Sequence, residues 1–158
     1  MKEIDLHTKI KVYMIEECTN LEKKLIDEAK KATQNSYAPY SEFNVGAALY
    51  LENGEIISAS NQENASYPQG LCAERNAVFY ANSKYPDQKV VAIAIAAFNK
   101  GKFTAMPITP CGGCRQVLLE TENRFNSPFK IYMVGEDKVY VVDTIKDLLP
   151  LSFGDSFF

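Results

Sequence analysis

Residues 89–98, KVVAIAIAAF, limit the folds open to this chain more than any other segment. The apolar residues run almost without interruption, which is typical of a strand that is buried on both faces of a sheet. A sheet with two buried faces needs a further layer of structure on each side. The segment therefore favours helices packed on both faces of a central sheet.

Strands are also predicted on both sides of this segment. Residues 44–60 contain two β-prone runs around Asn53-Gly54, a dipeptide suited to the positive φ angles of a tight hairpin turn. Residues 131–134 and 139–142 form two further strands. The turn between them is too short for a parallel crossover, so these last two strands are expected to be antiparallel neighbours.

Helical signals alternate with these strands. Thr19 and Glu22 form a possible capping box, and apolar residues recur at helical spacing from there up to Tyr37. Further helices are predicted over residues 72–85 and 111–122, and Thr144 can cap a last short helix that ends at Pro150. The order β-α-β-β-α-β-α-β-β-α suits a mixed sheet with helices on both faces.

The length of 158 residues, without internal repeats or linkers, leads us to expect one domain over residues 1–158. Residues 1–18 are predicted to be a strand-like N-terminal extension, because its apolar residues fall on one parity. These residues are Ile4, Leu6, Ile10 and Val12.

Composition narrows the class of function. The net charge of −3 and the pI near 5.3 give no electrostatic footprint for nucleic acid. No apolar run approaches the roughly 18 residues that a membrane span needs, and the first residues lack a secretory signal. We expect a cytoplasmic protein that acts on small neutral substrates and binds neither nucleic acid nor membrane. In that compartment cysteines are more often metal ligands or catalysts than disulfides.

Three of the four cysteines lie at predicted helix starts: Cys72 after Gly70-Leu71, and Cys111 and Cys114 after Pro110. Helix N-termini stabilise thiolates, and thiolates favour a soft or borderline metal, usually zinc inside cells. Two other interpretations are possible. A redox pair of Cys111 and Cys114 would leave Cys72 unexplained, and for Cys72 taken alone, simple packing in the core is a realistic alternative to metal binding.

A structural zinc site needs a fourth protein ligand, and the candidates are only Cys18 and His7. Both lie in the N-terminal extension, without metal-site spacing around them. Three ligands leave an open position, which is typical of catalytic zinc. Hydrolysis there needs a carboxylate that moves protons, and Glu74 stands on the same predicted first turn as Cys72. Arg75 is a candidate for offsetting the negative charge of the thiolates, and Arg115 is a similar candidate.

These residues carry a family resemblance. Cys72-Ala73-Glu74-Arg75 with Pro110-Cys111-Gly112-Gly113-Cys114-Arg115-Gln116 resembles the signature of the cytidine deaminases, in the version with three cysteine ligands. The similarity covers about residues 20–153 and includes Tyr37–Ser41, Phe43–Ala47, Asn61–Tyr67 and Leu148–Pro150. It implies an α/β fold, a three-layer α-β-α sandwich around a five-stranded mixed sheet.

The resemblance also implies a chemistry. One Zn²⁺ per chain is held by Cys72, Cys111 and Cys114, and Glu74 moves protons while water replaces the amine at C4 of the cytosine ring. Cytidine and deoxycytidine give uridine and deoxyuridine with release of ammonia, a step of pyrimidine salvage.

The resemblance implies substrate contacts as well. The Ala73 N–H binds the pyrimidine carbonyl, and the Thr109 carbonyl faces the amine. Phe43 packs on the base, although core packing explains a phenylalanine equally well. Asn61 and Glu63 bind the ribose hydroxyl; the contacts also include Tyr67 and Phe153. A carboxylate near the sugar disfavours a 5′-phosphate, so nucleosides are expected over nucleotides.

Phe153 resembles an aromatic residue that this family lends to the active site of a neighbouring subunit, which implies a homotetramer. Alternatively Phe153, Phe157 and Phe158 form a tail packed on their own domain. A blasticidin S-type deaminase shares the cysteine motifs but differs at the sugar-binding loop, where this chain has NQENASY. A polynucleotide-editing enzyme needs a basic and aromatic surface that the composition does not supply. A zinc-stabilised binding module without turnover is the alternative from another class.

Overall fold

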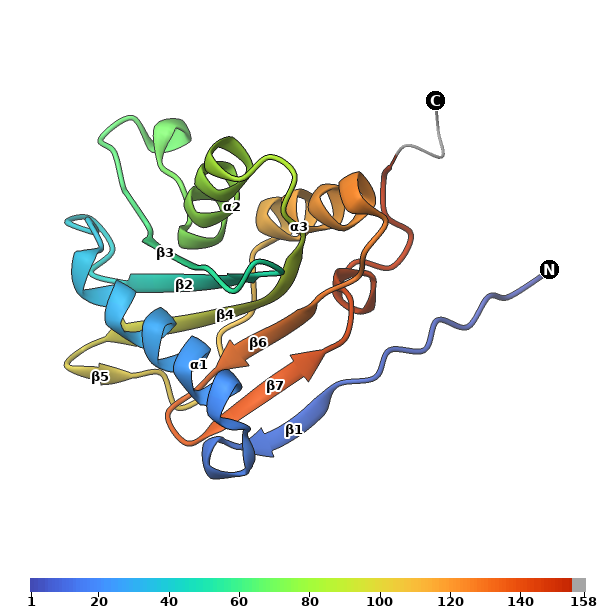
Figure 1. Ribbon diagram of the computed structural model, residues 1–158, viewed down its shortest axis with the longest axis horizontal. Coiled ribbons are helices and arrows are strands. Elements are labelled where there is room, and N and C mark those ends of the chain that lie inside the picture. The colour runs from blue at the N-terminus through green and yellow to red at the C-terminus, as the bar shows by residue number, and fades with distance from the viewer. Residues whose placement is uncertain (155–158) are drawn as a thin grey trace.

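A computed structural model describes residues 1–154, which form a seven-stranded sheet and three α-helices (Figure 1). The helices are α1 (Asn20–Ala32), α2 (Ala73–Lys84) and α3 (Gly112–Phe125). The strands are β1 (Lys11–Met14), β2 (Asn44–Leu51), β3 (Ile56–Ser60), β4 (Val90–Asn99), β5 (Lys102–Phe103), β6 (Lys130–Val134) and β7 (Lys138–Val142). Short 3-10 helices are η1 (Ile15–Glu17), η2 (Thr33–Asn35), η3 (Tyr67–Gln69) and η4 (Ile145–Leu148). Phe157 and Phe158 lie outside the described residues.

The sheet is mixed, as predicted, and its order is β1-β7-β6-β4-β2-β3, with β5 paired to β4. β4 and β6 are parallel and are connected through α3, whereas the other pairs are antiparallel, including β6 with β7. The expected number of five strands is wrong. β1 from the N-terminal segment adds to the edge of β7, and β5 is a two-residue strand that folds back on the end of β4.

The apolar segment KVVAIAIAAF forms most of β4, and the two faces of this strand differ. Ile93 and Ile95 pack in the cluster that α2 and α3 cover, while Ala92, Ala94 and Ala96 pack against α1. All five are buried. The large side chains fill one layer of the core, and the small ones let α1 lie close to the other face of the sheet. Helices therefore cover both faces, as expected.

Gly46 in β2 marks the closest approach of α1 to the sheet. A Cβ atom at this position would lie 2.1 Å from the carbonyl oxygen of Ala29 and 2.7 Å from the backbone nitrogen of Thr33. Both are backbone atoms, which cannot turn away as a flexible side chain can. The absence of a side chain at Gly46 therefore sets how closely α1 packs.

The predicted hairpin joins β2 to β3, but its turn differs from the expected one. Leu51 donates to the carbonyl of Glu55 over 3.0 Å, so three residues form the loop, and of these only Gly54 has a positive φ, of 88°. A three-residue loop that ends with a left-handed glycine is the second common hairpin type. Asn53 therefore does not need the positive φ that a two-residue turn requires.

The helix boundaries follow the predicted caps. Glu22 donates its backbone N–H to Thr19 and returns a carboxylate to the Thr19 N–H at 2.8 Å, which completes the capping box. α1 ends at Ala32, and η2 continues the chain toward Tyr37. Thr144 caps the last segment through the Lys146 N–H, but this segment is the 3-10 helix η4 and not an α-helix. Within residues 1–154, no helix combines the length and the apolar character that crossing a bilayer requires.

The N-terminal extension is a strand over a shorter stretch than predicted. Only Lys11–Met14 pair with β7, and residues 1–10 are exposed and run away from the body of the molecule (Figure 1). Thr8 is held to the domain by donating its hydroxyl to the carbonyl of Asp147.

Substitution of Gly46 tests the packing of α1. We expect Gly46→Ala to lower the free energy of unfolding by about 1–3 kcal/mol, because the added methyl group forces α1 away from the sheet. Gly113→Ala is the matched control, since its Cβ meets no atom within 4 Å. Urea unfolding followed by circular dichroism measures both, and equal stabilities for the two variants would contradict the close packing at Gly46.

Candidate metal centre and active site

The three cysteines named above meet where two helices begin. Cys72 is the N-cap residue of α2, Cys111 is the N-cap residue of α3, and Cys114 lies in the first turn of α3. Both helices cover the same face of the sheet (Figure 1). Their positive dipole ends and unpaired N–H groups therefore converge on one point, which favours thiolates there.

The sulfur geometry fits a metal ion. The three Sγ atoms all lie within 4.8 Å of one another, and those of Cys72 and Cys111 are 3.8 Å apart. Tetrahedral coordination with Zn–S bonds of about 2.3 Å separates sulfurs by about 3.8 Å. Cys114 is buried, whereas Cys111 is exposed, so one side of the cluster faces solvent. A three-sulfur set with an open side fits zinc that keeps a free coordination position.

The charges of the cluster also point to a cation. A hydrogen bond from Cys114 lowers the pKa of Cys72 to about 5 against the opposing effect of burial, with help from Arg75 and Cys111. The same hydrogen bond and burial raise the pKa of Cys114. Cys72 therefore ionises readily, whereas Cys114 resists ionisation beside it. A divalent ion supplies the positive charge that lets all three act as thiolates.

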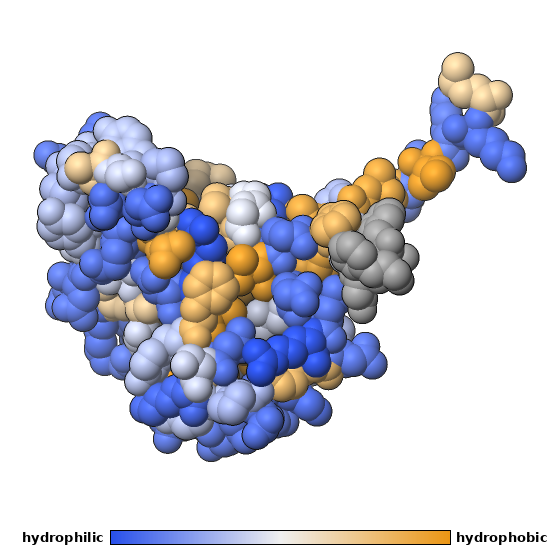
Figure 2. Space-filling view, turned by 90° about the horizontal axis from the view of Figure 1, so that it is seen from above, coloured by the Kyte–Doolittle hydropathy of each residue, from blue (hydrophilic) through white to orange (hydrophobic). Residues whose placement is uncertain are grey.

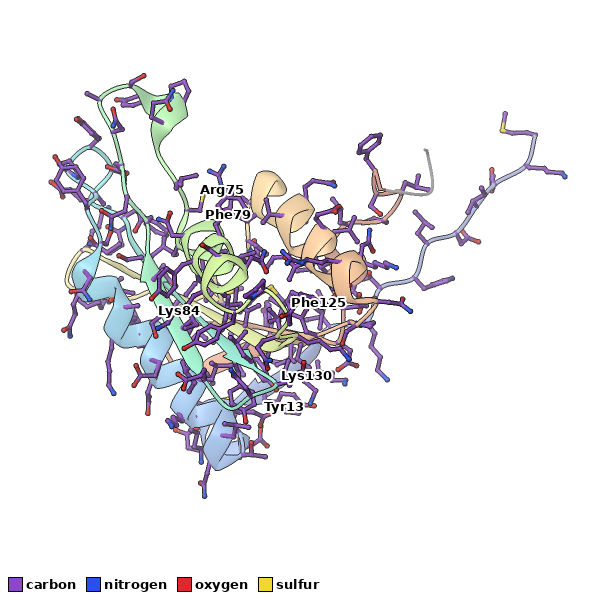
Figure 3. All side chains as sticks on the ribbon, turned by 45° about the horizontal axis from the view of Figure 1, so that its top comes forward. Tyr13, Arg75, Phe79, Lys84, Phe125 and Lys130 are labelled. Carbon is purple, nitrogen blue, oxygen red and sulfur yellow. The ribbon has the colours of Figure 1, made fainter. Side chains whose placement is uncertain are left out.

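Arg75 contacts the cluster, as predicted. Its Nη2 atom lies 4.0 Å from the Cys72 sulfur and 3.5 Å from the carbonyl oxygen of Gly70. Figure 3 shows Arg75 at the N-terminal end of α2, beside the start of α3. Arg115 has another role: it donates to the carbonyls of Pro110 and Leu148 at 2.9 and 2.7 Å. It braces the backbone before Cys111, and these hydrogen bonds of its side chain are made to backbone carbonyls rather than to the cysteine sulfurs.

Glu74 lies in the first turn of α2, two residues after Cys72, and is only 4% exposed. Burial raises the pKa of its carboxyl to about 7, and the negative charge of Cys72 acts in the same direction. Hydrogen bonds from its own backbone N–H and from Cys114 partly oppose this shift. A carboxyl group with a pKa near neutrality can both accept and donate a proton under physiological conditions.

A groove leads from Cys72 across the loop after β3. One cavity of about 200 Å³ is lined by Cys72, and a neighbouring cavity of about 310 Å³ shares three of its residues. The predicted contacts Asn61, Glu63 and Tyr67 all line the first cavity; the other lining residues are Gln62, Gly70 and Leu71. The second cavity adds Tyr40, Ser41 and Asn64.

Asn61 and Glu63 also brace this groove. The Asn61 amide accepts from the Val45 N–H at 2.8 Å and donates to the carbonyl of Phe43 at 3.0 Å. Glu63 accepts from the backbone N–H of Tyr40 at 2.9 Å and from the hydroxyl of Ser41. These bonds lower the pKa of Glu63, so its carboxylate stays ionised at neutral pH. Both residues hold the segment before β2 against the loop.

The remaining predicted contacts lie at different places. Ala73 is the buried first residue of α2, and Thr109 is exposed two positions before Cys111. Phe43 is half-buried and is fixed through its carbonyl by Asn61. Phe153 is 59% exposed, and its carbonyl accepts a hydrogen bond from Gln116 at 3.0 Å. Phe43, Thr109 and Phe153 are not among the residues that line the two cavities.

Three contributing residues were not assigned a role from the sequence. Ser41 and Tyr40 orient Glu63, and Gln116 holds the segment that carries Phe153. Each contact joins residues more than 20 positions apart. No local spacing reveals such a pair, although all three residues stand inside the motifs quoted for the resemblance.

Cys18 and His7 do not complete the metal site. Cys18 is buried in the cluster beneath α1, on the opposite face of the sheet, and its sulfur lies 3.9 Å from the carbonyl oxygen of Met14. His7 lies in the exposed N-terminal segment. Within residues 1–154, the group of cysteine, histidine or acidic side chains close enough to share a metal is formed by Cys72, Cys111 and Cys114.

Comparison with known proteins agrees with this geometry. The family described as "Cytidine and deoxycytidylate deaminase zinc-binding region" matches residues 19–125, a range that includes all three cysteines and Glu74. The chain belongs to this family. The metal of a zinc-binding deaminase region is zinc, and the three sulfurs form a group that could hold one such ion. The redox-pair and buried-cysteine interpretations leave this shared cluster unexplained.

Individual deaminases of the family are similar over most of the chain. The cytidine deaminase of Halalkalibacterium halodurans is 42% identical over 82% of this chain and 91% of its own length. That of Sporosarcina psychrophila is 40% identical over 82% and 89%. The crystal structure of cytidine deaminase from Burkholderia pseudomallei superposes with a TM-score of 0.71 at 38% identity, covering 86% of this chain and all of that one. The fold and the family are therefore shown together.

The cysteine cluster makes a direct prediction about metal content. We expect Cys111→Ser to lose most of the zinc, because one thiolate of three is replaced by a weaker ligand. Cys18→Ala is the matched control and should keep about one zinc per chain, because Cys18 lies on the other face of the sheet. Elemental analysis of the two purified proteins measures the ratio. A fully metallated Cys111→Ser variant would show that other ligands hold the metal.

Burial of Glu74 makes a second prediction, about stability and pH in the metal-free protein. The folded-state pKa is raised to about 7 from 4.5, so the wild-type fold loses stability as the pH rises between these values. We expect Glu74→Gln, which stays neutral, to gain up to about 3 kcal/mol over wild type between pH 4.5 and 7. Urea unfolding of chelator-treated, reduced protein at pH 5 and pH 8 measures the difference. A difference that does not change with pH contradicts the raised pKa.

Proposed function

We propose that this chain catalyses the hydrolytic deamination of cytidine and deoxycytidine to uridine and deoxyuridine, with release of ammonia. The observation that carries this proposal is the buried carboxyl of Glu74 next to a three-sulfur zinc site with an exposed side. The similarity to cytidine deaminases over more than four fifths of the chain gives the substrate class.

Zinc held by Cys72, Cys111 and Cys114 would supply a Lewis acid that lowers the pKa of a reacting water from ~15.7 toward 7. Glu74 does the proton transfers. It accepts a proton from the attacking water and delivers it to N3 of the ring as the oxygen adds to C4. It then moves the hydroxyl proton to the amine, which leaves as ammonia. The raised pKa of Glu74 suits both directions of transfer.

Arg75 and the helix ends tune the cluster. Three thiolates around one Zn²⁺ leave a net charge of −1, which opposes the ionisation of water. The guanidinium of Arg75 beside the Cys72 sulfur offsets part of that charge. The N-terminal ends of α2 and α3 act in the same direction. This compensation keeps an all-cysteine site acidic enough for hydrolysis.

The substrate contacts follow from the groove. The Ala73 N–H, at the start of α2, binds the pyrimidine carbonyl, and the carbonyl of Thr109 accepts from the amine. Asn61 and Glu63 bind the ribose hydroxyl, and Tyr67 borders the same cavity. Phe43 packs on the base from the segment that Asn61 fixes.

A nucleoside fits this groove better than a nucleotide. Glu63 is held as a carboxylate by the hydroxyl of Ser41 and the backbone of Tyr40, and it repels a 5′-phosphate. The residues that line the two cavities include no lysine, arginine or histidine to neutralise a phosphate. The loop NQENASY that supplies these residues also favours a nucleoside over blasticidin S.

The active enzyme is proposed to be a cytoplasmic homotetramer in which residues 1–158 of each subunit form one domain. Free thiolate ligands suit a reducing compartment. The segment that carries Phe153 is fixed to α3 by two hydrogen bonds. Gln116 donates to the carbonyl of Phe153, and Arg115 donates to the carbonyl of Leu148. An exposed aromatic side chain on a fixed segment suits a contribution to the site of a neighbouring subunit.

A screen of substrates tests the proposal. Cytidine, deoxycytidine, their 5′-monophosphates and blasticidin S are offered separately to one zinc-analysed sample, and the change in ultraviolet absorbance reports deamination. We expect turnover of both nucleosides and kcat/KM values at least tenfold lower for the monophosphates. A zinc-loaded sample that turns over none of the compounds would favour a binding module.

Glu74→Gln isolates the proton transfers. We expect this variant to keep about one zinc per chain while its kcat for cytidine falls by about 10²–10⁴-fold, because the amide cannot move protons. Zinc analysis of the same sample separates a lost base from a lost metal. Activity within a few fold of wild type would remove Glu74 from this role.

A further inference from the structure

The N-terminal arm, residues 2–12, presents a ribbon with two unlike faces. Its even-numbered apolar side chains are exposed: Ile4 by 81%, Leu6 by 55%, Ile10 by 44% and Val12 by 58%. Its odd-numbered residues are charged or polar: Glu3, Asp5, His7, Lys9 and Lys11. In the space-filling view a row of apolar residues follows the projecting segment (Figure 2). The arm has the pattern of a half-buried strand without a covered face.

The backbone of the arm continues an open sheet edge. β1 is the last strand in the sheet order and pairs with β7 on one side, so its other edge has no partner strand within residues 1–154. An unpaired edge with an alternating sequence is a template for another strand. The family match begins at residue 19, so the arm lies outside the matched zinc-binding region.

We propose that the arm pairs antiparallel with the arm of a second copy of this chain, about a twofold axis at His7. Residues directly opposite each other in such a pair lie on the same face. Centring on His7 sets Glu3 opposite Lys11 and Asp5 opposite Lys9, and each pair occurs twice by symmetry. On the other face Ile4 stands opposite Ile10. Leu6 stands opposite Thr8 and Val12 opposite Lys2, so the arm is complementary to itself chiefly in charge.

The alternatives fit less well. A shift by one residue on one strand sets apolar side chains opposite charged ones, because the side-chain period is two. Centring on Thr8 keeps the faces matched but leaves Glu3 opposite Tyr13 and His7 opposite Lys9. The register at His7 alone gives both acidic residues a lysine partner. Lys11 also binds Asp143 at 2.6 Å within its own chain, and its ammonium has further donors for Glu3.

Pairing of the arms would give the unpaired edge of β1 a partner strand. It joins the β1 edges of two sheets, brings the apolar side chains of both arms together on one face and sets the charged pairs on the other. An isologous contact of this kind uses one surface twice and closes without leaving a new edge at the arm. The contact forms at the β1 end of the sheet, and the inference does not depend on the proposed deamination.

A cysteine placed on the axis tests the register. His7→Cys should form a disulfide between two chains in the zinc-loaded full-length protein under oxidised glutathione, because opposed Cα atoms at about 4.5–5.5 Å allow the bond. Glu3→Cys, Thr8→Cys and the parent chain are the controls, since none of them has a cysteine on the axis. Non-reducing electrophoresis should show the cross-linked pair in His7→Cys at least tenfold above the controls. Preferential cross-linking of Thr8→Cys, or of no variant, would overturn the register.

A charge exchange tests the pairing itself. Asp5→Lys and Lys9→Glu each set like charges opposite one another twice, and we expect each to weaken association of the arms by about tenfold or more. The double variant D5K/K9E restores opposite charges and should recover association to within about threefold of the parent. Sedimentation of these proteins and of a chain lacking residues 1–10 gives the association constants. Equal association of all of them, together with no cross-link at residue 7, would refute the pairing; cytidine turnover should be unchanged throughout.

Discussion

The active site depends on the convergence of two helix N-termini at one point above the sheet. α2 and α3 start at Cys72 and Cys111, whose sulfurs are 3.8 Å apart. Each helix brings a partial positive charge and unpaired N–H groups to this point. Without them, three thiolates and a buried carboxyl within a few ångströms would repel one another strongly. The position of the helices on the sheet is therefore an electrostatic requirement as well as a matter of packing.

The sheet sets that position through the unequal faces of β4. The isoleucines at positions 93 and 95 support α2 and α3, while the alanines between them and Gly46 in the next strand allow α1 to lie close on the other side. β4 and β6 are parallel and α3 connects them, so the chain has to run back along the sheet through α3 before β6 begins. α3 therefore starts, with Cys111 as its N-cap, near the end of the sheet where β4 finishes. The packing of the core thus fixes the distance between the two helix starts.

The sequence predicted the parts of this structure that are encoded locally. The capping box at Thr19, the antiparallel β6–β7 pair and the two cysteine-bearing helix starts all follow from residues within a few positions of one another. The number of strands did not, because β1 is completed only by pairing with the distant strand β7, and β5 is a two-residue strand, too short to show an alternating pattern. The different role of Arg115 has the same origin, since its carbonyl partner at Leu148 is 33 positions away. Long-range hydrogen bonds leave no periodic trace in a sequence.

Asn61 and Glu63 illustrate how one residue can serve the fold and the substrate together. Their side chains already bind the backbone of residues 40–45, so their positions are fixed before a substrate arrives. Fixed polar groups lose little conformational entropy on binding, which would strengthen the proposed recognition of a ribose hydroxyl. The lowered pKa of Glu63 arises from the same bonds that orient it. The proposed preference for a nucleoside over a nucleotide would therefore be a consequence of how this loop folds, and a change at Glu63 would also loosen the segment that carries Phe43.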